Sequence, residues 1–478
     1  MTKQKFYITT AIDYVNGAPH IGHALEKIQA DVLARYYRLL GVPTFFLTGT
    51  DEHGQKNYAS AEREGLKPQA FVDRNAKVFQ ALTKVLNISN NFFIRTSDEK
   101  THWPGVEKFW KRLVEAGDIY KGKYEGWYCV GHEAFLTESD LVEGKCPDHD
   151  APPQRVEEEN YLFRYSKYVP QVIELIESGR LAVIPGFRKN EILNLLRSNP
   201  GDVSFSRPKD KLPWGVPVPG DKDHVIYVWG DALVNYLTGI GYGRDEKVFA
   251  KWWPADVHVI GKDILRFHAG IWPAMLLSAG VELPKTIFVH GFVQTGGHKI
   301  GKSLGNTIDP IALAEKYGPD ALRYFLLRES PPTGDSEFTI PKFEARYNAD
   351  LASGLGNLIS RVATLADKAA LEVAPPGKPN LANSYKIAVE DYRFNDALSG
   401  TWQKIASIDK QISDTKPWEL LESNPNQAKN VLTELVAQIR AVAVELSPFL
   451  PETAEAVQKI FAGPKIKSTE PLFPRLEK

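Results

Sequence analysis

The sequence predicts an α/β fold: a Rossmann-like, parallel-sheet domain with a small inserted domain, followed by a C-terminal α-helical bundle. Three observations support this prediction. Short β-rich runs alternate with helical periodicity over residues 1–115, and they return over 225–298. The segment between them, 116–224, is rich in Gly, Pro and charge, and the sequence beyond about 345 is almost wholly helical. At 478 residues the chain is long enough for several domains.

The first 115 residues open with a strand, a helix and a second strand. Residues 5–10 form a short β-rich run, and residues 21–40 carry apolar side chains at helical spacing until Gly41 and Pro43 end the helix. Residues 44–48 form the next strand, which leads into Gly49-Thr50-Asp51. This order predicts a parallel βαβ unit, and ligands of such sheets bind at the carboxyl ends of the strands.

Composition and charge are those of an ordinary globular protein. The chain is 43% hydrophobic and 24% charged, with a net charge of −1, so composition alone does not predict a nucleic-acid partner. No apolar run approaches the roughly 20 residues of a membrane helix, and no signal peptide precedes the first strand. Only two cysteines occur, which fits a reducing compartment. We therefore expect a cytoplasmic protein without a membrane partner.

A candidate phosphate site, His20-Ile21-Gly22-His23, stands at the start of the first predicted helix. A helix N-terminus presents N–H groups and partial positive charge, which suit phosphate. Gly22 permits a nucleotide to approach the backbone, and the imidazoles of His20 and His23 can donate hydrogen bonds to phosphate oxygens. A chance occurrence of the pattern is the alternative.

A second candidate phosphate site is the glycine-flanked loop Lys299-Ile300-Gly301-Lys302-Ser303. Its two lysines can neutralise charge that develops on a polyphosphate, although taken alone the loop can equally be a solvated basic turn. The two motifs together are more specific than either one. We expect the imidazoles of His20 and His23 and the lysine at 302 to face one triphosphate across the sheet edge.

The two motifs resemble the HIGH and KMSKS signatures of class I aminoacyl-tRNA synthetases. The second reads KIGKS here, so Met and the first Ser are replaced by Ile300 and Gly301 while both lysines remain. Residues 14–20, 46–54, 227–236 and 260–269 are similar to the methionyl-tRNA synthetase family, and the resemblance covers essentially the whole chain. It implies activation of L-methionine with ATP and Mg²⁺, then transfer to the terminal adenosine of tRNA(Met).

The resemblance also implies site residues. The catalytic group is His20, His23, Lys299 and Lys302, and the ATP-binding group is Gly22, Gly261, Asp263, Lys302 and Ser303. Asp51, a carboxylate at the carboxyl end of a strand, is expected to bind the methionine ammonium. The other methionine-binding residues are mostly apolar or aromatic, as a thioether requires: Ile12, Trp229, Ala232, Leu233, Tyr236, Ile264, Phe267 and His268.

Within this set, Tyr236 and His268 are expected to hydrogen-bond near the sulfur, whereas Trp229 and Phe267 have ordinary core packing as their alternative. Two positions depart from the family pattern. Asp13 stands where many relatives carry an aromatic residue, and Ile271 where some carry Phe. Both changes affect the expected rim of the pocket and leave its polar anchors in place.

The inserted segment carries Cys129-x-x-His132 and Cys146-x-x-His149, which together use both cysteines of the chain. Two such pairs predict a tetrahedral, structural zinc site, because four protein ligands leave no open position. Family members with a single knuckle usually carry Cys where this chain has His132. A metal-free remnant of the same fold is the alternative.

The predicted bundle, 346–478, resembles the family's anticodon-binding domain, and residues 299–345 its loop and stem-contact region. Asn357 and Arg361 are four residues apart and share a helical face, and Trp418 can stack on an unstacked base. Core packing of Trp418 is the alternative. Because no further tRNA-binding domain follows the bundle, we expect a monomer.

Two other functions remain open. Another class I synthetase, such as the cysteine enzyme, needs metal ligands around the pocket, whereas here they cluster in the insertion. The insertion is also too short for the editing domain of the Leu, Ile and Val enzymes, whose pockets separate aliphatic chains poorly. A non-catalytic, synthetase-like RNA-binding protein is expected to have lost motif residues that are all present here.

Overall fold

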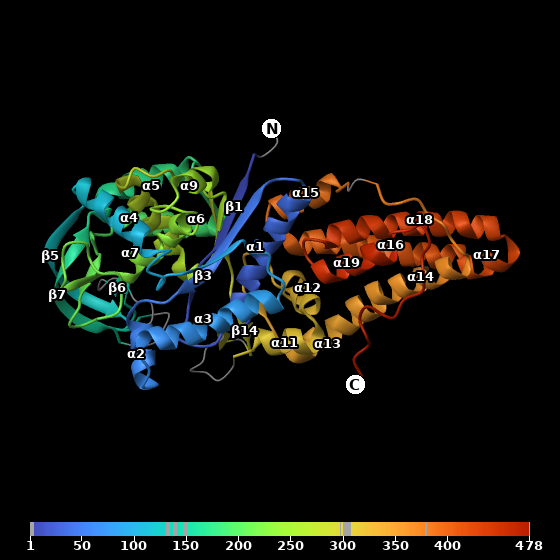
Figure 1. Cartoon of the computed structure of the whole chain (residues 1–478), viewed down its shortest axis with the longest axis horizontal. Coiled ribbons are helices and arrows are strands. Elements are labelled where there is room, and N and C mark those ends of the chain that lie inside the picture. The colour runs from blue at the N-terminus through green and yellow to red at the C-terminus, as the bar shows by residue number, and fades with distance from the viewer. Residues whose placement is uncertain are drawn as a thin grey trace. The chain divides into compact units, whose positions relative to one another are not determined.

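The computed structural model of the chain describes residues 4–130, 134–136, 141–146, 152–296, 298–299, 307–377 and 380–477. These residues fold into two compact units (Figure 1). Unit 1 comprises the residues up to Pro19, Val42–Thr83 and Asn90–His290. Unit 2 comprises His20–Gly41, Lys84–Ser89 and the residues from Gly291 onward. No described helix has the length and hydropathy of a membrane span.

Unit 1 is built on a parallel sheet with the strand order β2-β3-β1-β12-β13-β8, in which β4 also pairs with β3. Its strands are β1 (Phe6–Thr10), β2 (Asp13–Tyr14), β3 (Thr44–Asp51), β4 (Phe92–Arg95), β8 (Ala182–Ile184), β12 (Val257–Gly261) and β13 (Thr286–His290). The strands β1, β3, β12 and β13 are buried almost throughout, as expected of a parallel sheet that is covered on both faces. The predicted parallel α/β fold is confirmed.

Helices of unit 1 pack around this sheet over one large hydrophobic core. They are α2 (Gln55–Arg63), α3 (Pro68–Val85), α4 (Trp103–Glu115), α5 (Tyr165–Glu177), α6 (Gly186–Arg197), α7 (Val228–Ala232), α8 (Asn235–Thr238), α9 (Glu246–Trp252) and α10 (Trp272–Ser278). Between β12 and α10 lie the short helices η2 (Lys262–Ile264) and η3 (Phe267–Ile271). The helices α7, α8, η2 and η3, which carry most of the predicted methionine-binding residues, are each only three to five residues long.

Two smaller sheets lie between α4 and α7 in the sequence. An antiparallel sheet has the order β6-β5-β7-β9, with β5 (Ile119–Cys129), β6 (Ala134–Leu136), β7 (Gln154–Phe163) and β9 (Val203–Ser204), and Figure 1 shows the long β5–β7 ribbon. Strand β10 (Ser206–Pro208) pairs with β11 (His224–Ile226). The range 116–224, which we expected to be inserted as a whole, also supplies β8, and β8 pairs with β13 in the main sheet.

Among the β-rich runs expected over 225–298, the first, at 225–229, forms a strand only in part. Strand β11 ends at Ile226, and α7 begins at Val228. The run Val-Ile-Tyr-Val-Trp has high β-propensity, but tertiary packing overrides it. At Gly230, in α7, the ring of Phe205 lies 3.0 Å from where a Cβ would stand, so a larger residue here would require that ring to move by a few tenths of an ångström.

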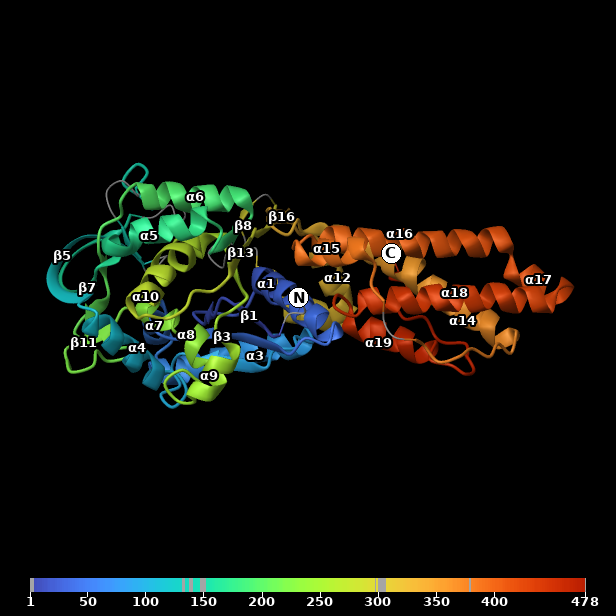
Figure 2. The same ribbon diagram turned by 90° about the horizontal axis from the view of Figure 1, so that it is seen from above.

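Unit 2 is mainly helical, as predicted for the region beyond 345. Its elements are α1 (Ile21–Leu39), β14 (Val293–Thr295), β15 (His298–Lys299), α11 (Pro310–Tyr317), α12 (Pro319–Glu329), β16 (Ser336–Glu337), α13 (Ile340–Arg346), η5 (Tyr347–Gly356), α14 (Asn357–Lys368), α15 (Asn383–Glu390), α16 (Phe394–Thr415), α17 (Pro417–Ser423), α18 (Pro425–Leu446) and α19 (Pro451–Ile460). Figure 2 shows α16 and α18 side by side in the bundle, and they are in contact. The short strands form a sheet of order β15-β14-β16.

A buried ion pair ties the elements of unit 2 together. Arg323 of α12 lies 2.8 Å from Asp31 of α1, and both side chains are fully buried. The guanidinium also donates to the carbonyls of Phe449, Pro448 and Leu86 at 2.7, 3.0 and 3.2 Å. A buried charge is tolerated when it is paired and its remaining donors are used, and Arg323 meets both conditions.

Candidate functional site

The HIGH-like motif forms the N-terminus of α1 in unit 2. His20 is the N-cap, its Nδ1 accepts a hydrogen bond from the Gly22 backbone N–H at 3.1 Å, and the His23 Nδ1 accepts from the His20 N–H at 3.0 Å. The two ring centroids are 3.9 Å apart. Because each Nδ1 accepts, each ring carries its hydrogen on Nε2, so the helix N-terminus presents two imidazole N–H donors.

Gly22 has a structural reason beyond nucleotide access. A Cβ at this position would lie 2.9 Å from Cε1 of the His20 ring, which is closer than side chains tolerate. Glycine therefore lets the His20 ring fold over the first turn and cap it. The sequence pattern predicted a role toward the ligand, and the structure adds a role in holding the motif itself.

Several predicted site residues lie outside the described residues. They are Lys302 and Ser303 of the KIGKS loop and His132 and His149 of the predicted metal site. The backbone of Lys299 is described as part of β15. The expectation that the lysine at 302 faces the two imidazoles therefore stays a prediction. Of the predicted metal site, Cys129 and Cys146 are described, and both are buried and form no disulfide.

The predicted methionine residues of unit 1 sit on short helices after β11 and β12. Trp229 on α7 stacks on Phe267 of η3, with ring centroids 3.8 Å apart and an interplanar angle of 4°. Trp229 also meets His268 edge-on at 6.0 Å. Ala232 and Leu233, which follow Trp229 in the sequence, are also buried. The structure thus brings together predicted residues that are more than thirty positions apart, and it does so through aromatic contacts.

Tyr236 and His268 form a hydrogen-bonded pair. The Tyr236 hydroxyl lies 2.7 Å from the His268 Nε2, and the His268 Nδ1 lies 3.0 Å from the carbonyl of Ile264. A carbonyl only accepts, so Nδ1 carries the hydrogen and Nε2 accepts from the tyrosine hydroxyl. Burial lowers the pKa of His268 to about 4, which keeps the ring neutral as this arrangement requires.

This pairing refines the expected role of Tyr236 and His268. In the structure the hydroxyl hydrogen of Tyr236 goes to His268, and both hydrogens of the pair are therefore already used. A second buried imidazole, His258, stacks on the Tyr236 ring with centroids 4.2 Å apart, and burial holds its pKa well below the usual value. The two imidazoles that contact Tyr236, those of His258 and His268, are thus both neutral.

Asp51 and the predicted ribose-binding residues lie at the carboxyl ends of parallel strands. Asp51 is the last residue of β3, is 3% exposed and pairs in register with Tyr14 of β2. Gly261 ends β12, and a Cβ there would lie 2.9 Å from the carboxylate of Asp263, so glycine makes room for that side chain. Ile12, between β1 and β2, and Ile264, in η2, are partly buried against the core.

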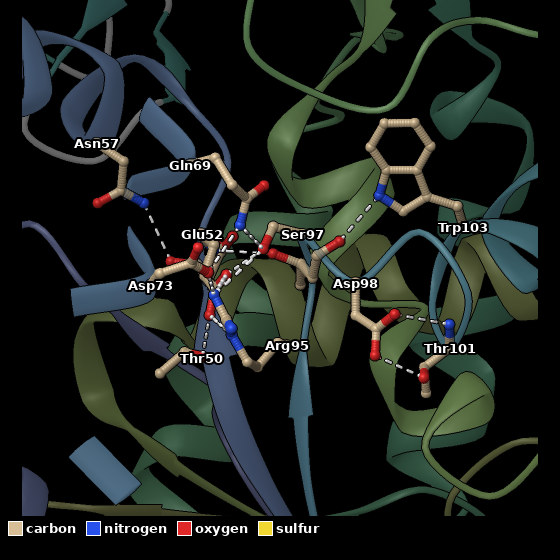
Figure 3. Close-up of polar contacts among 12 residues, drawn as sticks. Thr50, Glu52, Asn57, Gln69, Asp73, Arg95, Ser97, Asp98, Thr101 and Trp103 are labelled. Atoms are coloured by element: carbon tan, nitrogen blue, oxygen red, sulfur yellow. Dashed lines mark hydrogen bonds and ion pairs between the residues drawn. The ribbon is translucent and has the colours of Figure 1, made fainter. Parts of the chain in front are cut away.

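The residues after Asp51 belong to a buried polar network that the sequence analysis did not identify. Figure 3 shows Arg95, Ser97 and Thr50 converging on the carboxylate of Glu52. His53 and His102 both contact the carboxylate of Asp231 on α7, at 2.6 and 2.7 Å. Burial favours the neutral form of Asp231, but the two imidazoles more than offset it and lower its pKa to about 2.

Two of the predicted anticodon residues meet in unit 2. The guanidinium of Arg361 on α14 lies 5.0 Å from the ring centroid of Trp418 on α17, and it forms an ion pair with Asp409 at 3.2 Å. The Trp418 side chain is 39% exposed. A tryptophan of the core is not expected to be this open, so the structure favours a surface role for Trp418. Asn357 begins α14, one turn before Arg361.

Comparison with known proteins assigns the chain to a family. The model of the family "tRNA synthetases class I (M)" matches residues 6–158 and 149–363. The methionine–tRNA ligase of Thermotoga maritima is 44% identical, covering 95% of this chain and 74% of the relative. That of Brucella melitensis is 42% identical and covers 98% and 93%.

Solved structures agree. The Mycobacterium tuberculosis methionyl-tRNA synthetase in complex with methionyl-adenylate is 37% identical, with a TM-score of 0.91 and coverage of 99% of this chain and 100% of that one. Its apo form has a TM-score of 0.83 at 35% identity and covers 100% and 99%. The predicted resemblance is confirmed, and the chain belongs to the methionine branch of the class I tRNA synthetases.

Proposed function

We propose that this chain is a methionine–tRNA ligase that activates L-methionine with ATP and transfers it to tRNA(Met). In the first step a methionine carboxylate oxygen attacks the α-phosphorus of ATP, and the bond to the bridging oxygen breaks as pyrophosphate leaves. In the second step a ribose hydroxyl of the terminal adenosine attacks the adenylate carbonyl carbon. The carbonyl–phosphate bond breaks, AMP leaves and the hydroxyl loses its proton.

The observation that carries the proposal is the capped motif at the start of α1. Because the Nδ1 atoms of His20 and His23 accept main-chain hydrogen bonds, each ring carries its hydrogen on Nε2 at a helix N-terminus, a combination suited to phosphate. These donors stabilise charge on the phosphates, and Lys299 and Lys302 assist them. Mg²⁺ supplies further charge neutralisation on the triphosphate.

Substrate recognition is divided between one carboxylate and an apolar pocket. Asp51 binds the methionine ammonium, and Gly261 and Asp263 bind the ribose of ATP. The thioether lies in a pocket lined by aromatic residues, among them the stacked Trp229 and Phe267. In the bundle, Asn357, Arg361 and Trp418 read the CAU anticodon, with Trp418 stacking on an unstacked base.

The proposed activity is tested by pyrophosphate–ATP exchange on purified protein. Methionine is expected to support exchange, and other amino acids are not. His23→Ala is expected to lower kcat by about 10²-fold, because one donor to the developing charge is lost. Exchange with a different amino acid would overturn the substrate assignment, and no exchange with any amino acid would favour a non-catalytic RNA-binding role.

A structural Zn²⁺ site is also proposed for the insertion. The donor set fits zinc, since both cysteines are buried, neither forms a disulfide, and each has a histidine three residues later in the sequence. Cys129, His132, Cys146 and His149 would hold the ion, which would hold the β5–β7 region together. Metal analysis is expected to find about one zinc per chain, and much less in Cys146→Ser; equal metal in both would contradict the site.

We further propose that the chain works as a monomer in the cytoplasm. Light scattering after gel filtration tests the oligomeric state, and a mass of twice the calculated 53.5 kDa would contradict it.

A further inference from the structure

The main chain directly after β3 is held from several sides. The backbone N–H of Glu52 donates to the Thr96 hydroxyl at 2.8 Å, and the Glu52 carbonyl accepts from the Trp214 indole N–H at 2.7 Å. The Asn57 amide donates to the carbonyls of the residues before and after Glu52, each at 3.0 Å. This turn therefore has its conformation fixed by side chains from other elements, and it contains Asp51.

The Glu52 side chain is buried with a full set of donors. Its Oε1 accepts from the Thr50 hydroxyl at 2.6 Å and from the Arg95 Nε at 2.7 Å. Its Oε2 accepts from the Arg95 Nη2 at 2.8 Å and from the Ser97 hydroxyl. Two carboxylate oxygens offer about four acceptor sites, and all of them are used here. Figure 3 shows this convergence, together with the contact of Arg95 to Asp73.

The next residue, His53, is held by a different element. Its Nδ1 lies 2.6 Å from one carboxylate oxygen of Asp231, and the His102 Nε2 lies 2.7 Å from the other. The His102 Nδ1 in turn lies 2.7 Å from the Thr238 hydroxyl. All four side chains are buried. Asp231 thereby connects the turn after β3 to α7, the helix that also carries Trp229 and Ala232.

We propose that Glu52 and Asp231 are positioning residues that place the carboxylate of Asp51 for the methionine ammonium. Asp51 is followed directly by two residues whose side chains are anchored to different elements, β4 through Arg95 and α7 through Asp231. Errors of about 1 Å in the placement of a binding group cost up to about 10²-fold in rate or affinity. The inference rests on the proposed function, because it assumes that Asp51 binds the ammonium.

A purely structural role predicts a different result. If these buried groups served stability alone, their loss would lower the folded fraction and leave the affinity of the folded protein unchanged. If they position Asp51, their loss weakens only ligands that carry an ammonium group. Two ligands separate these cases: methioninol, and its analogue that lacks the amino group but keeps the thioether and the hydroxyl.

The test measures inhibition constants of both ligands against methionine in pyrophosphate–ATP exchange. Glu52→Gln and Asp231→Asn are expected to weaken methioninol by about tenfold or more and the deaminated analogue by less than about twofold. Replacing one acid oxygen by an amide keeps the shape of each side chain. Arg95 keeps Asp73 as a partner when the charge of Glu52 is removed, which favours folding of that variant.

Matched controls come from the same unit. Glu158 forms a buried bidentate pair with Arg207, with both bonds at 3.0 Å. Asp118 is a buried carboxylate that accepts from Lys167 and Ser278, each at 2.7 Å. Glu158→Gln and Asp118→Asn are expected to leave both inhibition constants unchanged. If Glu52→Gln or Asp231→Asn does not fold, Arg95→Lys and Ser97→Ala perturb the network more mildly.

The outcomes distinguish this inference from the proposed function. Asp51→Asn in the same assay is expected to remove the preference for methioninol over its deaminated analogue. If it does not, the role of Asp51 and this inference both fall. If Asp51→Asn behaves as expected but the Glu52 and Asp231 variants bind both ligands like the wild type, or weaken both equally, only the inference is overturned.

Discussion

Lowering the pH from 7 to 5 is expected to destabilise unit 1 through His268. Burial lowers the pKa of this ring to about 4 from its ordinary value of 6.5. Between pH 6.5 and pH 4 the unfolded chain binds a proton at His268 that the folded chain does not bind. The free energy of unfolding therefore falls as the pH falls through 6.5 toward 4, and the stabilising contribution of neutral His268 is fully present above pH 6.5. At about 1.36 kcal/mol per pH unit, the total is about 3 kcal/mol, of which about 2 kcal/mol is lost by pH 5.

The comparison of wild type with His268→Asn isolates this contribution. Other titrating groups act in both proteins, so the free energy of unfolding in urea, measured at pH 7 and pH 5, is expected to fall by about 2 kcal/mol more in the wild type. Neutral His268 also keeps its hydrogen bond from Tyr236 over this range, so the contribution of this pair to methionine KM is expected to stay constant from pH 7 to 5. Equal pH dependence of stability in the two proteins would refute the reasoning.

Three further changes test the fold and the pocket. Arg323→Met removes one of the two guanidinium partners of buried Asp31, which keeps Arg35 at 2.7 Å, and is expected to cost about 3 kcal/mol in thermal or urea unfolding, with a smaller loss in Arg323→Lys. Gly49→Ala places a Cβ 2.1 Å from the carbonyl oxygen of Ile94 in β4, so β3 must shift; a cost of about 1–3 kcal/mol in urea unfolding is expected, and an unchanged midpoint would contradict it. Tyr236→Phe leaves the His268 Nε2 without its donor and is expected to raise the methionine KM about tenfold in the exchange assay, with an ATP KM close to wild type.

The sequence predicted correctly those helices and strands whose ends are determined by nearby residues. The run at 44–48 and the helix at 21–40 correspond to β3 and α1, because buried strands and capped amphipathic helices carry their own signals. The sequence around Gly400 predicts separate helices that end at Leu398 and begin at Trp402, and this prediction is wrong, since α16 runs from Phe394 through Gly400 to Thr415. The interruption lies before Phe394, at Tyr392, whose φ of 61° no sequence pattern indicates. Packing of buried Ala397, Leu398 and Thr401 outweighs the helix cost of one glycine, about 1 kcal/mol.

Candidate site residues could be proposed from the sequence where a motif or a family stretch contains them, as for His20, His23 and Trp229, and their roles stay predictions. The network around Glu52 and Asp231 was not, although both residues lie within the quoted stretches 46–54 and 227–236. Its members come from β3 and the turn after it, from β4 and the segment between β4 and α4, and from α7, and each taken alone is an ordinary polar residue. Only the fold brings them together, because burial and partner identity are tertiary properties. A signal was present in Glu52-His53, two ionisable residues directly after a buried strand.

The short elements that carry the proposed methionine pocket depend on side-chain contacts for their positions. Helices α7, α8, η2 and η3 span three to five residues each, and η3 has π-helical geometry, which is rare and frequent at functional sites. Helices this short are not stable on their own, because a single turn does not offset the cost of nucleation. Their positions must therefore come from tertiary contacts: the Trp229–Phe267 stack, the Tyr236–His268 hydrogen bond and the carboxylate of Asp231. It follows that loss of one such contact displaces a pocket residue before it unfolds the unit, so its effect should appear in methionine affinity more strongly than in stability.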